Sequence, residues 1–112
     1  MNTASRKAKG RSLQKYLRDK LLEYSPGLTP DDVRSTPMGT QGEDVMLSAA
    51  AKALWPFRWE CKNQEGFGAI YTSYEQCTLH PGVGEPVLLI KSNRKRPLVV
   101  LDADYFFRMC KK

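Results

Sequence analysis

Apolar residues recur at helical spacing in the first part of the chain. Their separations of three, four and seven or eight residues place one stripe on a helix surface, and its members are Leu13, Tyr16, Leu17, Leu21 and Tyr24. We predict a helix from about Gly10 to Glu23, which Ser25-Pro26-Gly27 ends. Gln14 lies on the shoulder of this stripe, so its side chain can face a site beside the sheet.

The middle of the chain alternates with a period of two, which is typical of strands. Val33 to Thr36 fits a short strand, and Asp44 to Ser48 fits another with an acid at its start. Ser48 is placed to cap a short helix from Ala49 to Leu54. In the next strand, Phe57 to Lys62, Trp59 and Cys61 share one face and Glu60 and Lys62 share the other.

The last part of the chain predicts a helix and two strands before a final helix. The helix runs from about Phe67 to Leu79, and the continuous apolar run Pro86 to Ile90 indicates a buried central strand. Leu98 to Leu101 follows as a strand, and Asp102 is expected to cap the final helix. The order of elements predicts an α/β fold in which helices flank a mixed central sheet.

The length of 112 residues favours one domain, from residue 10 to 112, preceded by a flexible basic arm at residues 1–9. No apolar run approaches the roughly 20 residues that cross a bilayer, so we expect no membrane partner. The charged first residues lack the apolar stretch of a secretory signal, which favours the cytoplasm. Three cysteines without a C-x-x-C pair and a single histidine, His80, do not fit a zinc cage.

The net charge of +6 is concentrated in two clusters, at residues 6–20 and 91–96. Basic clusters bind nucleic acid by releasing counterions from its phosphates, so DNA is the expected partner. The residues expected to contact it are Lys9, Arg11, Arg94, Lys95 and Arg96. A merely soluble basic surface, with a solvated hairpin turn at residues 91–96, is the alternative.

An acid on one strand and an acid-x-lysine on the next suit phosphodiester hydrolysis. Asp44 and Glu60 could share a divalent cation if their strands are neighbours, and Lys62 follows Glu60 on the same face at about 7 Å. The cation would activate water, and the ammonium group would stabilise the phosphate. A turn acid at Asp44 and a surface ion pair between Glu60 and Lys62 form the alternative interpretation. His80 is a poor general base without a positioned partner.

The run Glu43-Asp44-Val45, the Glu60-Cys61-Lys62 strand and the order of elements resemble the PD-(D/E)XK nuclease superfamily. Within it, the segments 9–14 and 60–63 resemble archaeal-type Holliday junction resolvases and small related phage proteins. The likeness covers roughly residues 9 to 105. It implies a restriction-endonuclease-like αβββαβ core and a Mg²⁺-dependent (or Mn²⁺-dependent) endonuclease that acts on branched DNA as a homodimer.

By this resemblance, Asp44 and Glu60 bind the metal, the Cys61 carbonyl is a further ligand, and Lys62 serves the attacking water. Gln14 and Gln76 are auxiliary residues of the active site, although Gln76 fits a solvent-facing position equally well. The chain departs from the pattern in two places: Glu43 stands where the superfamily has proline, and Gln14 where resolvases have glutamate. An amide brings no charge, so the number of metal ions stays open. The rival hypothesis is an inert DNA-binding module with a basic phosphate-binding surface.

Overall fold

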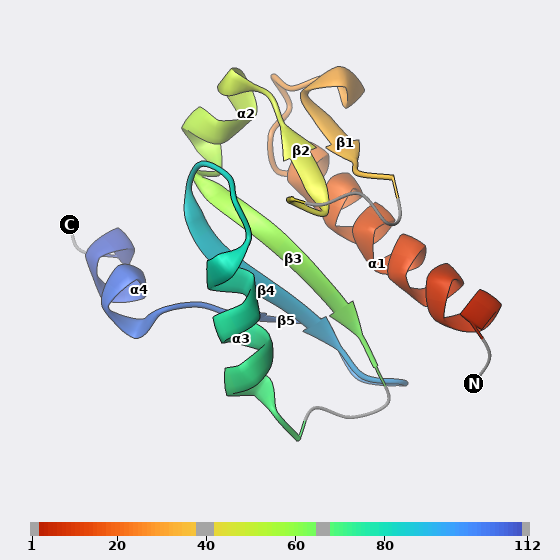
Figure 1. Ribbon diagram of the computed structural model, residues 1–112. Coiled ribbons are helices and arrows are strands. Elements are labelled where there is room, and N and C mark those ends of the chain that lie inside the picture. The colour runs from red at the N-terminus through yellow and green to blue at the C-terminus, as the bar shows by residue number, and fades with distance from the viewer. Residues whose placement is uncertain (1–2, 38–41, 65–67, 111–112) are drawn as a thin grey trace.

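A computed structural model describes residues 3–37, 42–64 and 68–110 of the chain. The fold is α/β, with a mixed three-stranded sheet flanked by helices (Figure 1). A smaller two-stranded sheet lies beside it. None of the helices in the described part is long and apolar enough to cross a membrane.

The first helix, α1, spans Thr3–Glu23 and therefore begins seven residues before the predicted start at Gly10. The expectation of a loose arm is wrong for residues 3–9, because alanine, lysine and arginine favour helix and a single glycine costs only about 1 kcal/mol. Residues 1 and 2 lie outside the described part. The buried stripe is also narrower than predicted: Leu13, Leu17 and Leu21 are buried, whereas Tyr16 and Tyr24 are exposed.

The strands form two sheets, where one mixed sheet was expected. Strand β1 (Val33–Ser35) pairs antiparallel with β2 (Val45–Leu47). Strand β3 (Phe57–Asn63) runs parallel to β4 (Glu85–Lys91), and β4 pairs antiparallel with β5 (Leu98–Val100). A main-chain hydrogen bond from Asp44 N, just before the start of β2, to Trp59 O (3.0 Å) joins the two sheets.

Among the described residues, a short 3-10 helix (Pro30–Asp32) precedes β1, and three further α-helices connect or follow the strands. Helix α2 (Ala49–Leu54) has the predicted cap, because the Ser48 hydroxyl accepts the N–H of Ala51 at 3.1 Å. Helix α3 (Ile70–Leu79) forms the crossover between the parallel strands β3 and β4, and the predicted start at Phe67 lies outside the described residues. Helix α4 (Ala103–Cys110) begins at the predicted Asp102 cap, whose carboxylate accepts the N–H of Tyr105 at 2.9 Å.

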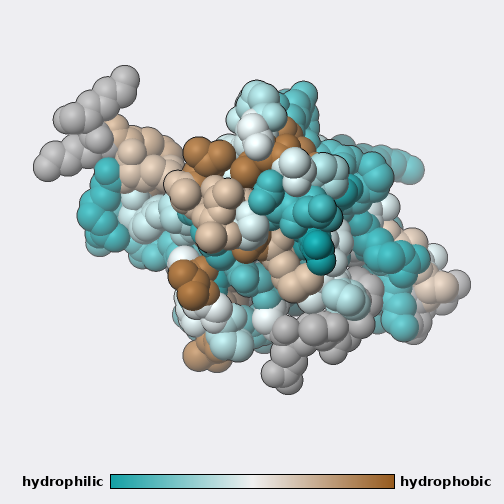
Figure 2. Space-filling view, turned by 90° about the horizontal axis from the view of Figure 1, so that it is seen from above, coloured by the Kyte–Doolittle hydropathy of each residue, from teal (hydrophilic) through white to brown (hydrophobic). Residues whose placement is uncertain are grey.

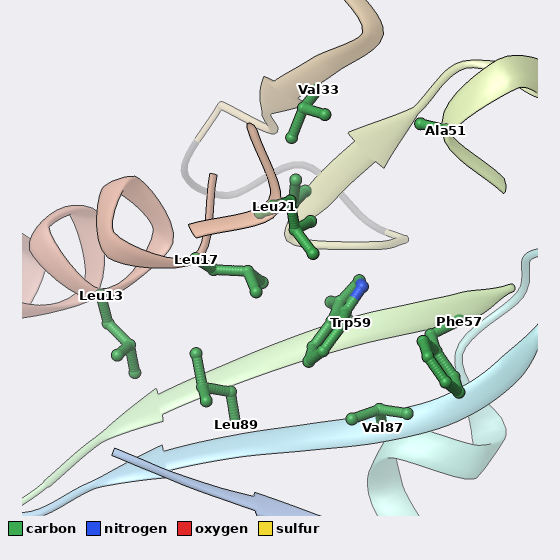
Figure 3. Packing of buried hydrophobic residues seen from close by; sticks show 10 residues of the cluster. Leu13, Leu17, Leu21, Val33, Ala51, Phe57, Trp59, Val87 and Leu89 are labelled. Carbon is green, nitrogen blue, oxygen red and sulfur yellow. The ribbon is translucent and has the colours of Figure 1, made fainter. Parts of the chain in front are cut away.

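The core lies between α1 and the three-stranded sheet (Figure 3). Leu13 and Leu17 of α1 point toward Trp59 of β3 and Leu89 of β4, and all four side chains are buried. Strand β4 is buried on both faces, as the apolar run predicts, because α1 covers one face and α3 packs on the other. This packing fixes β3 against β4 and leaves the other edge of β3 for Asp44.

Candidate active site

Two hydrogen bonds hold Asp44 against the free edge of β3. Its N–H donates to Trp59 O, and its carboxylate Oδ2 accepts the N–H of Cys61 at 2.7 Å. The bonds fall on alternate residues of β3, which direct their main-chain groups to the same edge. The Asp44 side chain is half-buried and lies beside the strand that carries Glu60.

Glu60 and Lys62 extend from the face of β3 opposite the core residue Trp59, in agreement with the predicted alternation. The Glu60 side chain is only 12% exposed, and Lys62 is half-buried. Helix α3 covers this face, and its residue Cys77 is buried close to Glu60. A carboxylate and an ammonium group therefore share a partly enclosed surface.

The charges of these groups act on one another. Burial raises the pKa of Asp44, whereas the Cys61 N–H and the charges of Lys62 and His80 oppose that rise. Burial also raises the pKa of Glu60, and the negative charge of Asp44 raises it further. Burial therefore disfavours the ionised form of both carboxyl groups, and a cation bound between them would favour it.

His80 is the residue that sequence reasoning missed. Its Nδ1 lies 3.0 Å from Glu60 Oε2, so the histidine has the positioned partner that its sequence context did not show. Arg58 of β3 holds it there, because the guanidinium donates to the carbonyls of His80 and of Gly84. The crossover between β3 and β4 creates this contact, and no local pattern signals it across 20 residues.

The two glutamines predicted as auxiliary residues have different positions. Gln14 is buried on α1, where it lines a cleft together with Thr36. Gln76 is exposed on α3, whereas its neighbour Cys77 is buried close to Glu60. The charges of Lys62 and His80 act on the carboxyl groups of Asp44 and Glu60, and we define the candidate site by these four residues.

The residues expected to bind DNA divide between two sides of α1. Lys9 donates to the Asn93 side chain at 2.6 Å, which brings the loop with Arg94, Lys95 and Arg96 against α1. These three residues of the loop are exposed. Arg11, two positions after Lys9, points instead into the cleft that Gln14 lines.

The donor set fits a hard divalent cation such as Mg²⁺. It offers the carboxylates of Asp44 and Glu60 and, on the same edge of β3 as the Cys61 N–H, the Cys61 carbonyl. In the described part of the chain, no group of three or more histidine, cysteine, aspartate or glutamate side chains is arranged to hold a metal. A cation bound here would be held by the two carboxylates and the Cys61 carbonyl, with water completing its ligands.

Comparison with models of protein families, with curated proteins and with solved structures gave no match to this chain.

The pKa of Glu60 leads to a prediction about stability. A carboxyl group whose pKa is raised by folding favours the folded state fully below its ordinary pKa of 4.5, and this contribution is lost as the pH rises through the raised value. Replacing Glu60 by glutamine should therefore raise the melting temperature at pH 7, and the gain should disappear near pH 4. We expect the free energy of unfolding at pH 7 to rise by about 0.5–2 kcal/mol, the usual gain from a single stabilising substitution.

Thermal denaturation at several pH values measures this effect. Glu75→Gln, which removes an exposed carboxylate from α3, is the control and should change little. A lower melting temperature of Glu60→Gln at pH 7 would show that the bond to His80 outweighs the burial of the charge.

Proposed function

We propose that this protein is a divalent-metal-dependent DNA endonuclease of the PD-(D/E)XK type. The observation that carries the proposal is the hydrogen bond from Cys61 N to Asp44 Oδ2, which holds one carboxylate beside the strand that carries Glu60 and Lys62. Two further observations support it: the charge of Lys62 lowers the pKa of both carboxyl groups, and the charge of Asp44 raises the pKa of Glu60.

Each residue has a role in the proposed reaction. Asp44 and Glu60, with the Cys61 carbonyl, hold Mg²⁺ or Mn²⁺. The bound metal activates water and offsets the charge on the phosphate. The Lys62 ammonium group orients the attacking water and stabilises the charged phosphate. His80 holds Oε2 of Glu60 and thereby orients the other carboxylate oxygen.

The order of the elements supports the same proposal. Helix α1, strands β1, β2 and β3, helix α3 and strand β4 follow one another as in an αβββαβ core, with α2 as an insertion. Asp44 precedes the second of these strands, and Glu60 and Lys62 lie on the third.

We further propose that the substrate is branched DNA, such as a four-way junction, and that a homodimer cuts it in the cytoplasm of the cell. This part follows from the resemblance to Holliday junction resolvases. A two-fold symmetric junction suits a protein with two-fold symmetry, because each subunit then meets one of two equivalent strands.

A substrate panel tests the proposal. The protein is incubated with a labelled four-way junction, a linear duplex and a single strand, in Mg²⁺, Mn²⁺ or EDTA. We expect cleavage with either metal, fastest for the junction, and none in EDTA. Cleavage that persists in EDTA contradicts the metal mechanism, and binding without cleavage favours the inert DNA-binding module.

A further inference from the structure

A cleft of about 670 Å³ lies between α1 and β1, on the shoulder of α1 away from the loop that Lys9 contacts. We call it the α1–β1 cleft, and its cationic lining residues are Arg11, Lys15, Arg18 and Arg34. Sequence charge alone does not group Arg34 with the others. The cleft exists because β1 packs against the same helix that supplies three of the four cations.

The cleft has more positive than negative charge. Lys15 lies 2.7 Å and Arg18 lies 3.9 Å from Asp19, and Arg34 lies 3.4 Å from Asp31. Two carboxylates thus face four cations, which leaves two positive charges in excess. Among the described residues, Arg11 has no salt bridge.

The ion pairs of the cleft are exposed and therefore weak. The Lys15 side chain is 71% exposed and Asp31 is 89% exposed, and such pairs contribute about 0–1 kcal/mol. Phosphate oxygens can replace these carboxylates, since arginine binds phosphate through two parallel N–H groups. Arg18 differs, because its Nε donates to Val33 O at 3.0 Å and so fixes β1 against the helix.

The lining of the cleft is bonded to the candidate active site. Thr36, at the end of β1, donates its N–H to Asp44 O at 2.8 Å and its hydroxyl to Glu43 O. A strand of nucleic acid lying in the cleft would therefore pass beside the segment that carries Asp44. On the face seen in Figure 2, hydrophilic residues predominate on the side where α1 lies, and hydrophobic residues gather near the middle and toward α4.

We propose that the α1–β1 cleft binds the sugar-phosphate backbone of DNA next to the bond that is cut, and that Arg11 and Arg34 are the main phosphate contacts. The inference rests on the proposed function, because that function makes DNA the substrate. The expectation based on sequence assigned DNA contact to Lys9, Arg11, Arg94, Lys95 and Arg96. The cleft keeps Arg11 and adds Arg34, and it lies apart from the loop with the other arginines.

The test is the salt dependence of binding to a fluorescein-labelled DNA duplex in EDTA, where no metal-dependent cleavage intervenes. Arg11→Gln and Arg34→Gln should each reduce the slope of log Kd against log salt by about one, and the double variant by about two. Arg108→Gln is the matched control, because α4 lies far from α1 (Figure 1). An unchanged slope in the double variant, with an unchanged melting temperature, removes the cleft from the DNA surface.

Parallel cleavage assays separate this inference from the proposed function. If the wild-type protein binds DNA through the two arginines but never cuts it, the cleft is a DNA site and the endonuclease proposal is wrong. If the protein cuts DNA and the double variant binds like wild type, the endonuclease proposal stands and the cleft is excluded. Absence of DNA binding by the wild-type protein contradicts both.

Discussion

Replacing Asp44 by asparagine is expected to reduce metal-dependent DNA cleavage by at least about 10²–10³-fold, the loss typical of removing one preorganised electrostatic group. Asparagine can still accept the Cys61 N–H, so the edge of β3 keeps its bond. It has no charge to bind the metal. Mg²⁺ should therefore raise the melting temperature of the wild-type protein but not of Asp44→Asn, since a ligand stabilises only a state that binds it.

Lys62→Ala separates metal binding from the action on water and phosphate in the same experiment. We expect a loss of cleavage of similar size, because the ammonium group acts on the water and the phosphate, but an unchanged response of the melting temperature to Mg²⁺. Asp104→Asn and Lys20→Ala, which remove exposed charges from α4 and α1, are the matched controls. Near-normal cleavage by both active-site variants would contradict the proposed mechanism.

The elements that were predicted correctly from the sequence are those whose position depends on residues close together in the chain. The Ser48 and Asp102 caps depend on a side chain and an N–H three residues later, and both form as predicted. The apolar run in β4 has one arrangement that buries all of it, at the centre of a sheet. Alternation along β3 likewise placed Glu60 and Lys62 on the face opposite Trp59.

The parts of the site that could not be predicted depend on distant segments. The register Phe57↔Glu85 places the turn before β4 over the start of β3, where Arg58 holds His80 beside Glu60. The division into two sheets follows from how β1 and β2 pair, which strand patterns do not specify. Lys9 and Arg11 are close in sequence, yet a helix turns them to different sides.

The largest effect on stability is expected at Lys52, which holds together three segments around Asp44. Its ammonium group contacts the Glu43 carboxylate at 2.5 Å, Phe57 O at 2.6 Å and Val83 O at 2.7 Å. The Lys52 and Glu43 side chains are 18% and 17% exposed, so water reaches the pair poorly. Where the nuclease pattern has proline before its aspartate, this chain has a glutamate that Lys52 holds in place.

Lys52→Met should lower the free energy of unfolding by about 2–4 kcal/mol, because it leaves a partly buried carboxylate and two carbonyl groups without their donor. Glu43→Gln should cost about 1 kcal/mol, because the amide oxygen can still accept a hydrogen bond from Lys52. The double variant Lys52→Met/Glu43→Gln should lose less free energy of unfolding than the sum of the two single losses, since no unpaired charge then remains. We expect a coupling of about 1–2 kcal/mol.

Urea denaturation measures all three variants. Lys20→Met is the control, because it breaks the exposed pair with Glu23 and should cost under about 1 kcal/mol. Strict additivity would mean that the Lys52–Glu43 pair contributes nothing, and that the hydrogen bonds from Lys52 to the two carbonyl groups alone hold the turn before β4 against the start of β3.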